Sequence, residues 1–138
     1  LLEKQKLVVE GAGSVGVAAL MHNKLPELKG KKVAVVLSGG NLDVTLLSVI
    51  IEKGLIKSSR KMKLTVTLVD KPGSLRKLTE LLEELSANIV HISYDRTSTT
   101  LDYGDANVTI DLETKGAEHQ DKIYDLLKDN GYFSKKNY

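Results

Sequence analysis

The second half of the chain has the more regular alternation of apolar and polar residues. Residues 64–68 alternate apolar side chains with threonines, which is typical of a strand with one buried face. Two later segments repeat this alternation, and two others carry leucine or isoleucine at helical spacing with charged residues between them. We therefore expect strands over 64–68, 90–94, 108–112 and 132–134, and helices over 74–85 and 118–129. The order β-α-β-β-α-β predicts a ferredoxin-like sandwich, an α+β fold.

The first half has the pattern of an α/β segment. An apolar stretch at 7–9 leads through a glycine turn into a helix that continues to Leu20. Residues 32–37 are typical of a parallel strand buried on both faces, and a second helix follows over 42–51, with Gly54 as its expected C-cap. A β-α-β-α unit has only a two-stranded sheet, which cannot be a complete domain. We expect other protein surface to cover it.

The charge distribution supports a division of the chain into two parts. Residues 1–62 hold ten basic and five acidic side chains, a net charge of +5, whereas residues 63–138 hold ten and thirteen, a net charge of −3. We expect a first part at 1–57, a linker at 58–62 and a second domain at 63–138.

Composition excludes several classes of function. The 138 residues include no cysteine, so disulfides and thiolate zinc sites are excluded, and three separate histidines give no metal-ligand spacing. The sequence has no apolar run long enough for a membrane span and no secretory signal, so a cytoplasmic protein without membrane contact is expected. The basic first part has no aromatic residue for stacking on bases, which argues against nucleic-acid binding. We predict no metal site.

Residues 11–16 match the G-x-G-x-x-G pattern between an expected strand and a helix. A dinucleotide site also needs an acidic residue at the end of the next strand, and that position holds Ser38, Gly39 and Gly40 instead. We therefore favour a packing role, in which glycines let the helix approach the strand closely. A part of an NAD-dependent dehydrogenase is kept as an alternative.

Two further segments have the chemistry of ligand sites. Residues 38–41 follow the buried strand, where α/β sheets present binding groups, and they offer the Ser38 hydroxyl and Asn41 as a helix cap. In the turn at 70–74, Gly73 permits close approach, the helix start suits a carboxylate, and Asp70 can accept from an ammonium group, so an amino acid fits both ends. For each segment a plain turn remains the alternative, with Ser74 acting only as a helix cap at the second.

These motifs resemble two known families. Val8-Val9-Glu10-Gly11-Ala12-Gly13, followed by Val35-Val36-Leu37-Ser38-Gly39-Gly40-Asn41-Leu42-Asp43, is similar to the C-terminal end of the catalytic domain of fold-type II, pyridoxal-phosphate-dependent threonine dehydratases and serine racemases. Asp70-Lys71-Pro72-Gly73-Ser74-Leu75, with the β-α-β-β-α-β order, resembles an ACT regulatory domain. Tyr94-Asp95-Arg96 is similar to the His-Asp-Arg of threonine dehydratases, with Tyr94 a departure.

The first resemblance implies the C-terminal part of a threonine dehydratase, which converts L-threonine to 2-oxobutyrate and ammonia. In that family the serine at the position of Ser38 faces the pyridine nitrogen of pyridoxal 5'-phosphate, and Gly39 and Gly40 shape the pocket beside it. Glu10 would lie near the active site in a role that the resemblance does not assign. The family's Schiff-base lysine and phosphate-binding loop have no counterpart here, so this chain alone is expected to hold no catalytic residue, to bind no cofactor and to be inactive.

The second resemblance implies regulation by an amino acid such as isoleucine or valine. The effector would bind where two copies meet, so a homo-oligomer, a dimer or tetramer, is expected. A non-enzymatic amino-acid-sensing module is the alternative. The expected effector contacts are Asp70, Pro72, Gly73, Ser74 and Leu75 of one copy, with Asn88 and Ile89 of the facing copy.

Overall fold

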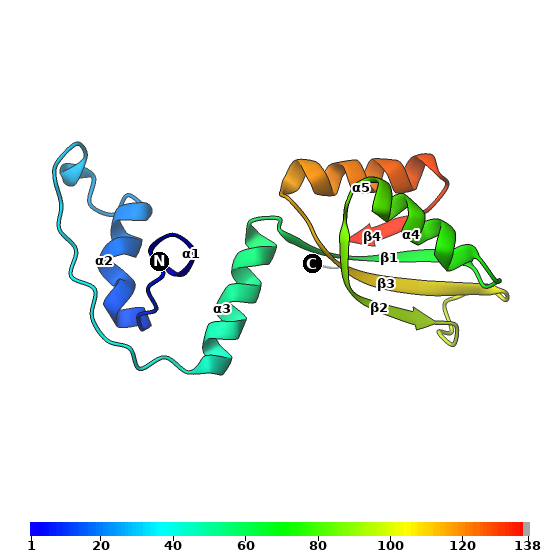
Figure 1. Cartoon of the computed structure of the whole chain (residues 1–138), viewed down its shortest axis with the longest axis horizontal. Helices are drawn as coiled ribbons and strands as arrows, with labels where there is room; N and C mark the ends of the chain where they lie inside the picture. Colours follow the sequence, from blue (N-terminus) through cyan, green and yellow to red (C-terminus); the bar gives the residue numbers. More distant parts are fainter. Residues whose placement is uncertain (137–138) are drawn as a thin grey trace. The chain divides into compact units, whose positions relative to one another are not determined.

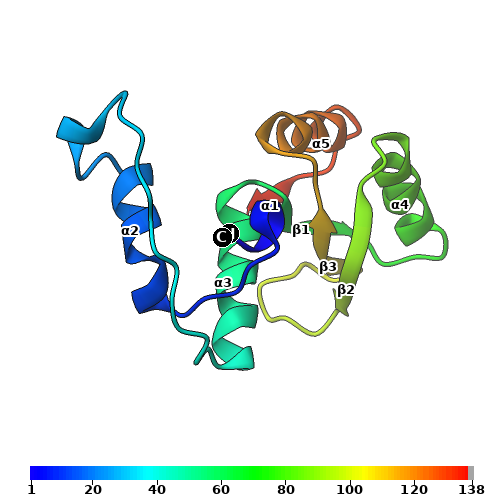
Figure 2. The ribbon, with the colours of Figure 1, turned by 60° about the vertical axis from the view of Figure 1, so that its left-hand side comes forward.

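A computed structural model describes residues 1–136, and the chain divides into two compact units, Leu1–Ile50 and Ile51–Tyr138. The second unit contains a four-stranded antiparallel sheet in the order β2-β3-β1-β4. Its strands and helices are β1 (Lys61–Val69), α4 (Ser74–Glu84), β2 (Asn88–Asp95), β3 (Asp105–Glu113), α5 (Ala117–Asp129) and β4 (Ser134–Lys136). Both helices lie on one face of the sheet (Figures 1 and 2). The prediction of a ferredoxin-like sandwich is confirmed.

The core lies between the helices and the two central strands. Alternate residues of β1 and β3 face α4 and α5, which is why period-two alternation in the sequence marked these strands. The buried apolar side chains, each at most 6% exposed, are Met62, Leu64, Val66, Leu68, Leu78, Leu82, Ala106, Val108, Ile110, Leu112, Ile123 and Leu127.

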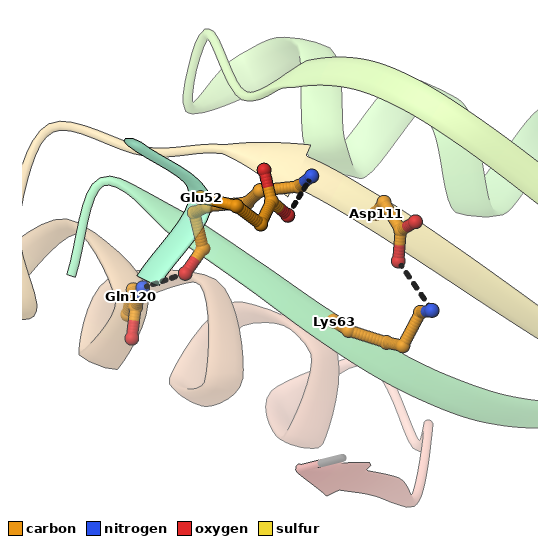
Figure 3. Close-up of polar contacts among 5 residues, drawn as sticks. Glu52, Lys63, Asp111 and Gln120 are labelled. Atoms are coloured by element: carbon orange, nitrogen blue, oxygen red, sulfur yellow. Dashed lines mark hydrogen bonds and ion pairs between the residues drawn. The ribbon is translucent and has the colours of Figure 1, made fainter. Parts of the chain in front are cut away.

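The opposite face of the sheet is polar. Side chains of β1 and β3 on this face pair across the strands. The pairs are Lys63 with Asp111 at 3.3 Å (Figure 3), Thr65 with Thr109 at 2.8 Å and Thr67 with Asn107 at 2.7 Å.

The connection between α3 (Val44–Lys57) and β1 is held by buried polar side chains. Gln120, which is 4% exposed, donates from its amide nitrogen to the Ser59 carbonyl at 3.1 Å and to the Lys61 carbonyl at 3.2 Å. The Thr114 hydroxyl donates to the same Ser59 carbonyl at 2.6 Å. The Lys61 ammonium forms an ion pair with Glu52 of α3 (Figure 3). Lys61 and Met62, placed in the expected linker, belong to β1.

The first unit contains α1 (Leu2–Gln5), α2 (Gly11–Met21), the 3₁₀ turn η1 (Pro26–Leu28) and the start of α3. The strands expected at 7–9 and 32–37 are not formed among the described residues of this unit. In place of a strand ladder, a hydrogen bond from the Glu10 amide to the Gly39 carbonyl at 3.3 Å joins residues that follow the two segments. A two-stranded sheet is marginal without neighbouring strands, which explains why these apolar segments stay extended and unpaired.

The expected positions of both ends of α3 are also wrong. Helix α3 continues through Gly54 to Lys57, so Gly54 is not its C-cap. Asp43, not Asn41, caps its start, because Asp43 Oδ1 accepts from the Thr45 and Leu46 amides at 2.6 and 3.1 Å. These bonds, that to Leu46 first, hold the pKa of the Asp43 carboxyl below its usual value.

The first unit leaves its apolar side chains exposed. Many large hydrophobic residues of α2, of α3 and of the extended segments are more than a third exposed, and Gly13 is the only buried residue described in this unit. No helix in the described part of the chain is both long and apolar enough to cross a membrane.

Candidate functional site

The glycine motif brings α2 against the segment that precedes the 38–41 turn. A Cβ at Gly13 would lie 1.6 Å from the Ser38 carbonyl oxygen, and one at Gly16 would lie 2.8 Å from Val35 Cγ1. Figure 2 shows this segment passing beside α2 as an extended chain. The glycines therefore permit close backbone packing, which supports the packing role over the dinucleotide fingerprint.

The 38–41 turn is shaped by main-chain contacts. Gly39 has a φ of +78°, in the left-handed region, and the Leu42 amide donates to the Gly40 carbonyl at 2.9 Å. The Ser38 hydroxyl is exposed and makes no hydrogen bond to any residue in 1–136. A Cβ at Gly40 would meet nothing within 4 Å. A free hydroxyl beside an uncrowded glycine fits the pyridine ring of pyridoxal 5'-phosphate, the group that the resemblance places there.

The turn at 70–74 has the open geometry that the sequence predicts at Gly73. Gly73 has a φ of +87°, and a Cβ there would meet nothing within 4 Å. Ser74 is the first residue of α4 and is 8% exposed, but Gly73 occupies the N-cap position and no side chain caps this helix. The expectation that Ser74 caps α4 is therefore wrong.

The Asp70 carboxylate already has two partners within the chain. The Tyr94 hydroxyl donates to Asp70 Oδ1 at 2.9 Å, and Arg96 Nε lies 3.4 Å from Oδ2. The Arg96 guanidinium also lies 5.6 Å from the centre of the Tyr94 ring. The hydrogen bond to the carboxylate is the main reason that the pKa of Tyr94 lies above its usual value. An incoming ammonium group would therefore have to compete with Tyr94 and Arg96 for Asp70.

Tyr94 and Arg96 were not among the residues predicted for the effector site. Their signal in the sequence was the Tyr94-Asp95-Arg96 motif at the end of β2. A hollow of about 530 Å³ adjoins Arg96 and Asp70 and is lined also by Ser98, Leu101 and residues 102–105.

Asn88 and Ile89 lie at the other end of β2. Asn88 and Asp95 are seven positions apart, which corresponds to about 24 Å along a strand. The Asn88 side-chain amide donates to the Glu113 carboxylate at 2.8 Å, and Ile89 packs against the core. Within one chain, the fold does not bring Asn88 and Ile89 together with the 70–74 turn.

Relatives among proteins of known function match both units. The chain is 47% identical over 132 residues to an L-threonine ammonia-lyase of Geobacter sulfurreducens, a match that covers 96% of this chain and 33% of that protein. It is 45% identical to the L-threonine ammonia-lyase of Thermotoga maritima, with 96% and 32% covered, and 28% identical to a biosynthetic L-threonine dehydratase of Lactococcus lactis, with 96% and 31% covered.

Comparisons with solved structures and with family models add less. A prephenate dehydratase of Streptococcus mutans aligns with a TM-score of 0.47 at 23% identity, covering 55% of this chain and 40% of that one. No family model matches the chain. The resemblance inferred from the motifs is confirmed by the sequence relatives: the chain is a homologue of the L-threonine ammonia-lyases and dehydratases and spans about a third of their length.

Proposed function

We propose that this chain is the C-terminal part of an L-threonine ammonia-lyase, which releases ammonia and 2-oxobutyrate from L-threonine. The observation that carries the proposal is the 47% identity over 132 residues, which spans the 38–41 turn and the ferredoxin-like unit together. A non-enzymatic sensing module would not need the first unit. A dinucleotide-dependent dehydrogenase is disfavoured, because the glycines of α2 are taken up by backbone packing against Ser38.

In this proposal, residues 38–40 form one wall of the cofactor site. Pyridoxal 5'-phosphate, when bound, supplies an electron sink for carbanion chemistry. The Ser38 hydroxyl would bond to the pyridine nitrogen, while Gly40, whose Cβ position is open, would leave room for the ring and Gly39 would shape the turn beside it. A neutral hydroxyl does not hold a proton on that nitrogen as a carboxylate would, which suits elimination of the β-hydroxyl better than transamination.

The activity can be tested by comparing two proteins. The full-length enzyme, in which a domain with the Schiff-base lysine precedes this chain, is expected to release ammonia and 2-oxobutyrate from L-threonine. The 138-residue chain alone is expected to release neither, because it has no counterpart of that lysine. A colorimetric assay for 2-oxobutyrate with L-threonine and L-serine measures both. Turnover by the chain alone would contradict the assignment of the lysine to another part of the enzyme.

We also propose that the ferredoxin-like unit binds an aliphatic amino acid such as isoleucine or valine between two copies. β2 is an edge strand, and its Val90, Ile92 and Tyr94 side chains are 53%, 38% and 37% exposed. Antiparallel pairing of two β2 strands would place Asn88 of the partner subunit opposite the Tyr94 end of this chain. Site halves that lie at opposite ends of β2 in one chain would then meet.

Effector binding should raise the thermal midpoint of the chain. A ligand at about 100 times its Kd stabilises the native state by about 2.7 kcal/mol, so isoleucine or valine should shift the melt by several degrees. Gly73→Asp should abolish the shift, because it puts a negative side chain where the ligand carboxylate approaches. Gly116→Asp is the matched control, since Gly116 also precedes a helix with positive φ and open space at its Cβ.

Two measurements complete this test. The unliganded melt of each variant gives the cost of an aspartate at positive φ, and calorimetric titration of isoleucine, valine, threonine and serine measures affinity directly.

A substitution on the edge strand tests assembly. Ile92→Lys on β2 should weaken both the assembly measured by light scattering and the binding measured by calorimetry, whereas Lys135→Glu on the opposite edge strand should leave both unchanged. Binding that survives Gly73→Asp, or assembly that Ile92→Lys does not affect, would sink the shared-site proposal.

A further inference from the structure

Glu10 forms hydrogen bonds to the 38–41 turn through both its main chain and its side chain. Its amide donates to the Gly39 carbonyl at 3.3 Å, and its Oε2 accepts from the Asn41 amide at 3.3 Å. The two bonds fall on either side of Gly40. Glu10 is also the N-cap residue of α2, yet its side chain makes no capping bond to that helix. The carboxylate therefore serves the turn rather than its own helix.

The Glu10 carboxylate also fills the space that a side chain at position 39 would need. A Cβ on Gly39 would lie 2.5 Å from Glu10 Cδ and 2.6 Å from Oε1. A side chain at position 39 would therefore displace the end of the Glu10 side chain, and the φ of +78° independently favours glycine. One turn of α2 further on, Gly13 lies against the Ser38 carbonyl. Glu10 and Gly13, at the start of α2, therefore contact both the start and the end of the 38–41 turn.

We propose that Glu10 is a positioning residue that fixes the 38–41 turn and so sets the place from which the Ser38 hydroxyl acts. Glu10 reaches the site through the main-chain amide of Asn41 and needs only an acceptor oxygen there. The importance of this position for a cofactor rests on the proposed function. The positioning itself is a property of the chain and can be tested without any cofactor.

Amide hydrogen exchange of the ¹⁵N-labelled chain tests the contact. Glu10→Ala should speed exchange at Asn41 about five-fold, the effect expected for loss of one ordinary hydrogen bond. Glu10→Gln keeps an acceptor oxygen and should stay within about two-fold of the parent chain. Glu27→Ala removes an exposed carboxylate from the same unit and should change nothing at Asn41. The amides of α2 show whether a variant has disturbed the unit as a whole.

A double-mutant cycle tests the occupied space independently. Gly39→Ala should speed amide exchange at Asn41 by a smaller factor in a Glu10→Ala background than in the parent chain. In that background the clash with the carboxylate is gone, whereas the strain of positive φ remains. Gly40→Ala, which meets nothing within 4 Å, should show no such coupling. The proposal would be overturned if Glu10→Ala left the Asn41 exchange rate unchanged, or if Glu10→Gln raised that rate as much as Glu10→Ala does. Equal coupling of Glu10→Ala to Gly39→Ala and to Gly40→Ala would overturn it as well.

Discussion

Gln120→Leu should lower the free energy of unfolding of the ferredoxin-like unit by about 1–3 kcal/mol. The substitution keeps a similar volume but removes a donor that is buried beside three oxygens, the Ser59 and Lys61 carbonyls and the Thr114 hydroxyl at 3.1 Å. Buried acceptors that lose a partner bear a desolvation cost of that size. Urea denaturation followed by far-ultraviolet circular dichroism measures the change.

Asn130→Ala is the matched control for this experiment. The Asn130 side-chain amide also donates to a carbonyl, that of Leu126 at 2.9 Å, but the residue is exposed at the end of α5. Water can replace its hydrogen bond, so the change should stay within about 0.5 kcal/mol. An equal cost for Gln120→Leu and Asn130→Ala would show that burial at the connection between α3 and β1 adds nothing to stability.

Gly13→Ala should separate α2 from the segment that carries Ser38. A methyl group 1.6 Å from a backbone oxygen cannot be accommodated by turning a side chain, so the two main chains must move apart. Overpacking of this kind costs about 1–3 kcal/mol, which corresponds to amide exchange roughly five- to a hundred-fold faster at the contact. Exchange at residues 11–21 and 35–41 measures the loss.

Gly54→Ala provides the control for a glycine in a helix. A Cβ at Gly54 meets nothing within 4 Å, so the alanine should add helix propensity and stabilise α3 by about 0.5–1 kcal/mol. If Gly13→Ala were as harmless as Gly54→Ala, the glycine motif would have no packing role, and the reason for rejecting a dinucleotide fingerprint would be lost.

The edge position of β2 has a consequence for how a ligand would meet the turn at 70–74. Tyr94 on β2 and Arg96 just after it both bind the Asp70 carboxylate. The β2 edge and the turn at 70–74 are therefore joined by one hydrogen bond and one ion pair. A ligand that engaged Asp70 would have to displace these partners. Binding and the state of the β2 edge would then be coupled, since both depend on Tyr94.

The sequence by itself determined the ferredoxin-like unit. Its strands β1 and β3 bury every second residue, so the alternation of apolar and polar positions predicts which residues are buried. The turn at Gly73 was predictable for a local reason, because a helix start after Pro72-Gly73 depends on few distant contacts. The family resemblance was equally visible in short motifs, and the sequence relatives bear it out.

The tertiary structure decided what depends on distant partners. The alternation at 90–94 implied that Val90, Ile92 and Tyr94 share a face, but a register shift between Ile89 and His91 removes Val90 from that row and turns Ile89 towards the core. The apolar runs at 7–9 and 32–37 have the composition of strands, yet a strand needs a neighbour with which to exchange hydrogen bonds. The engagement of Asp70 by Tyr94 and Arg96, and of Asn41 by Glu10, likewise joins residues more than twenty positions apart. Periodicity reports which face of an element is buried, whereas these contacts depend on which elements become neighbours, and only the folded chain determines that.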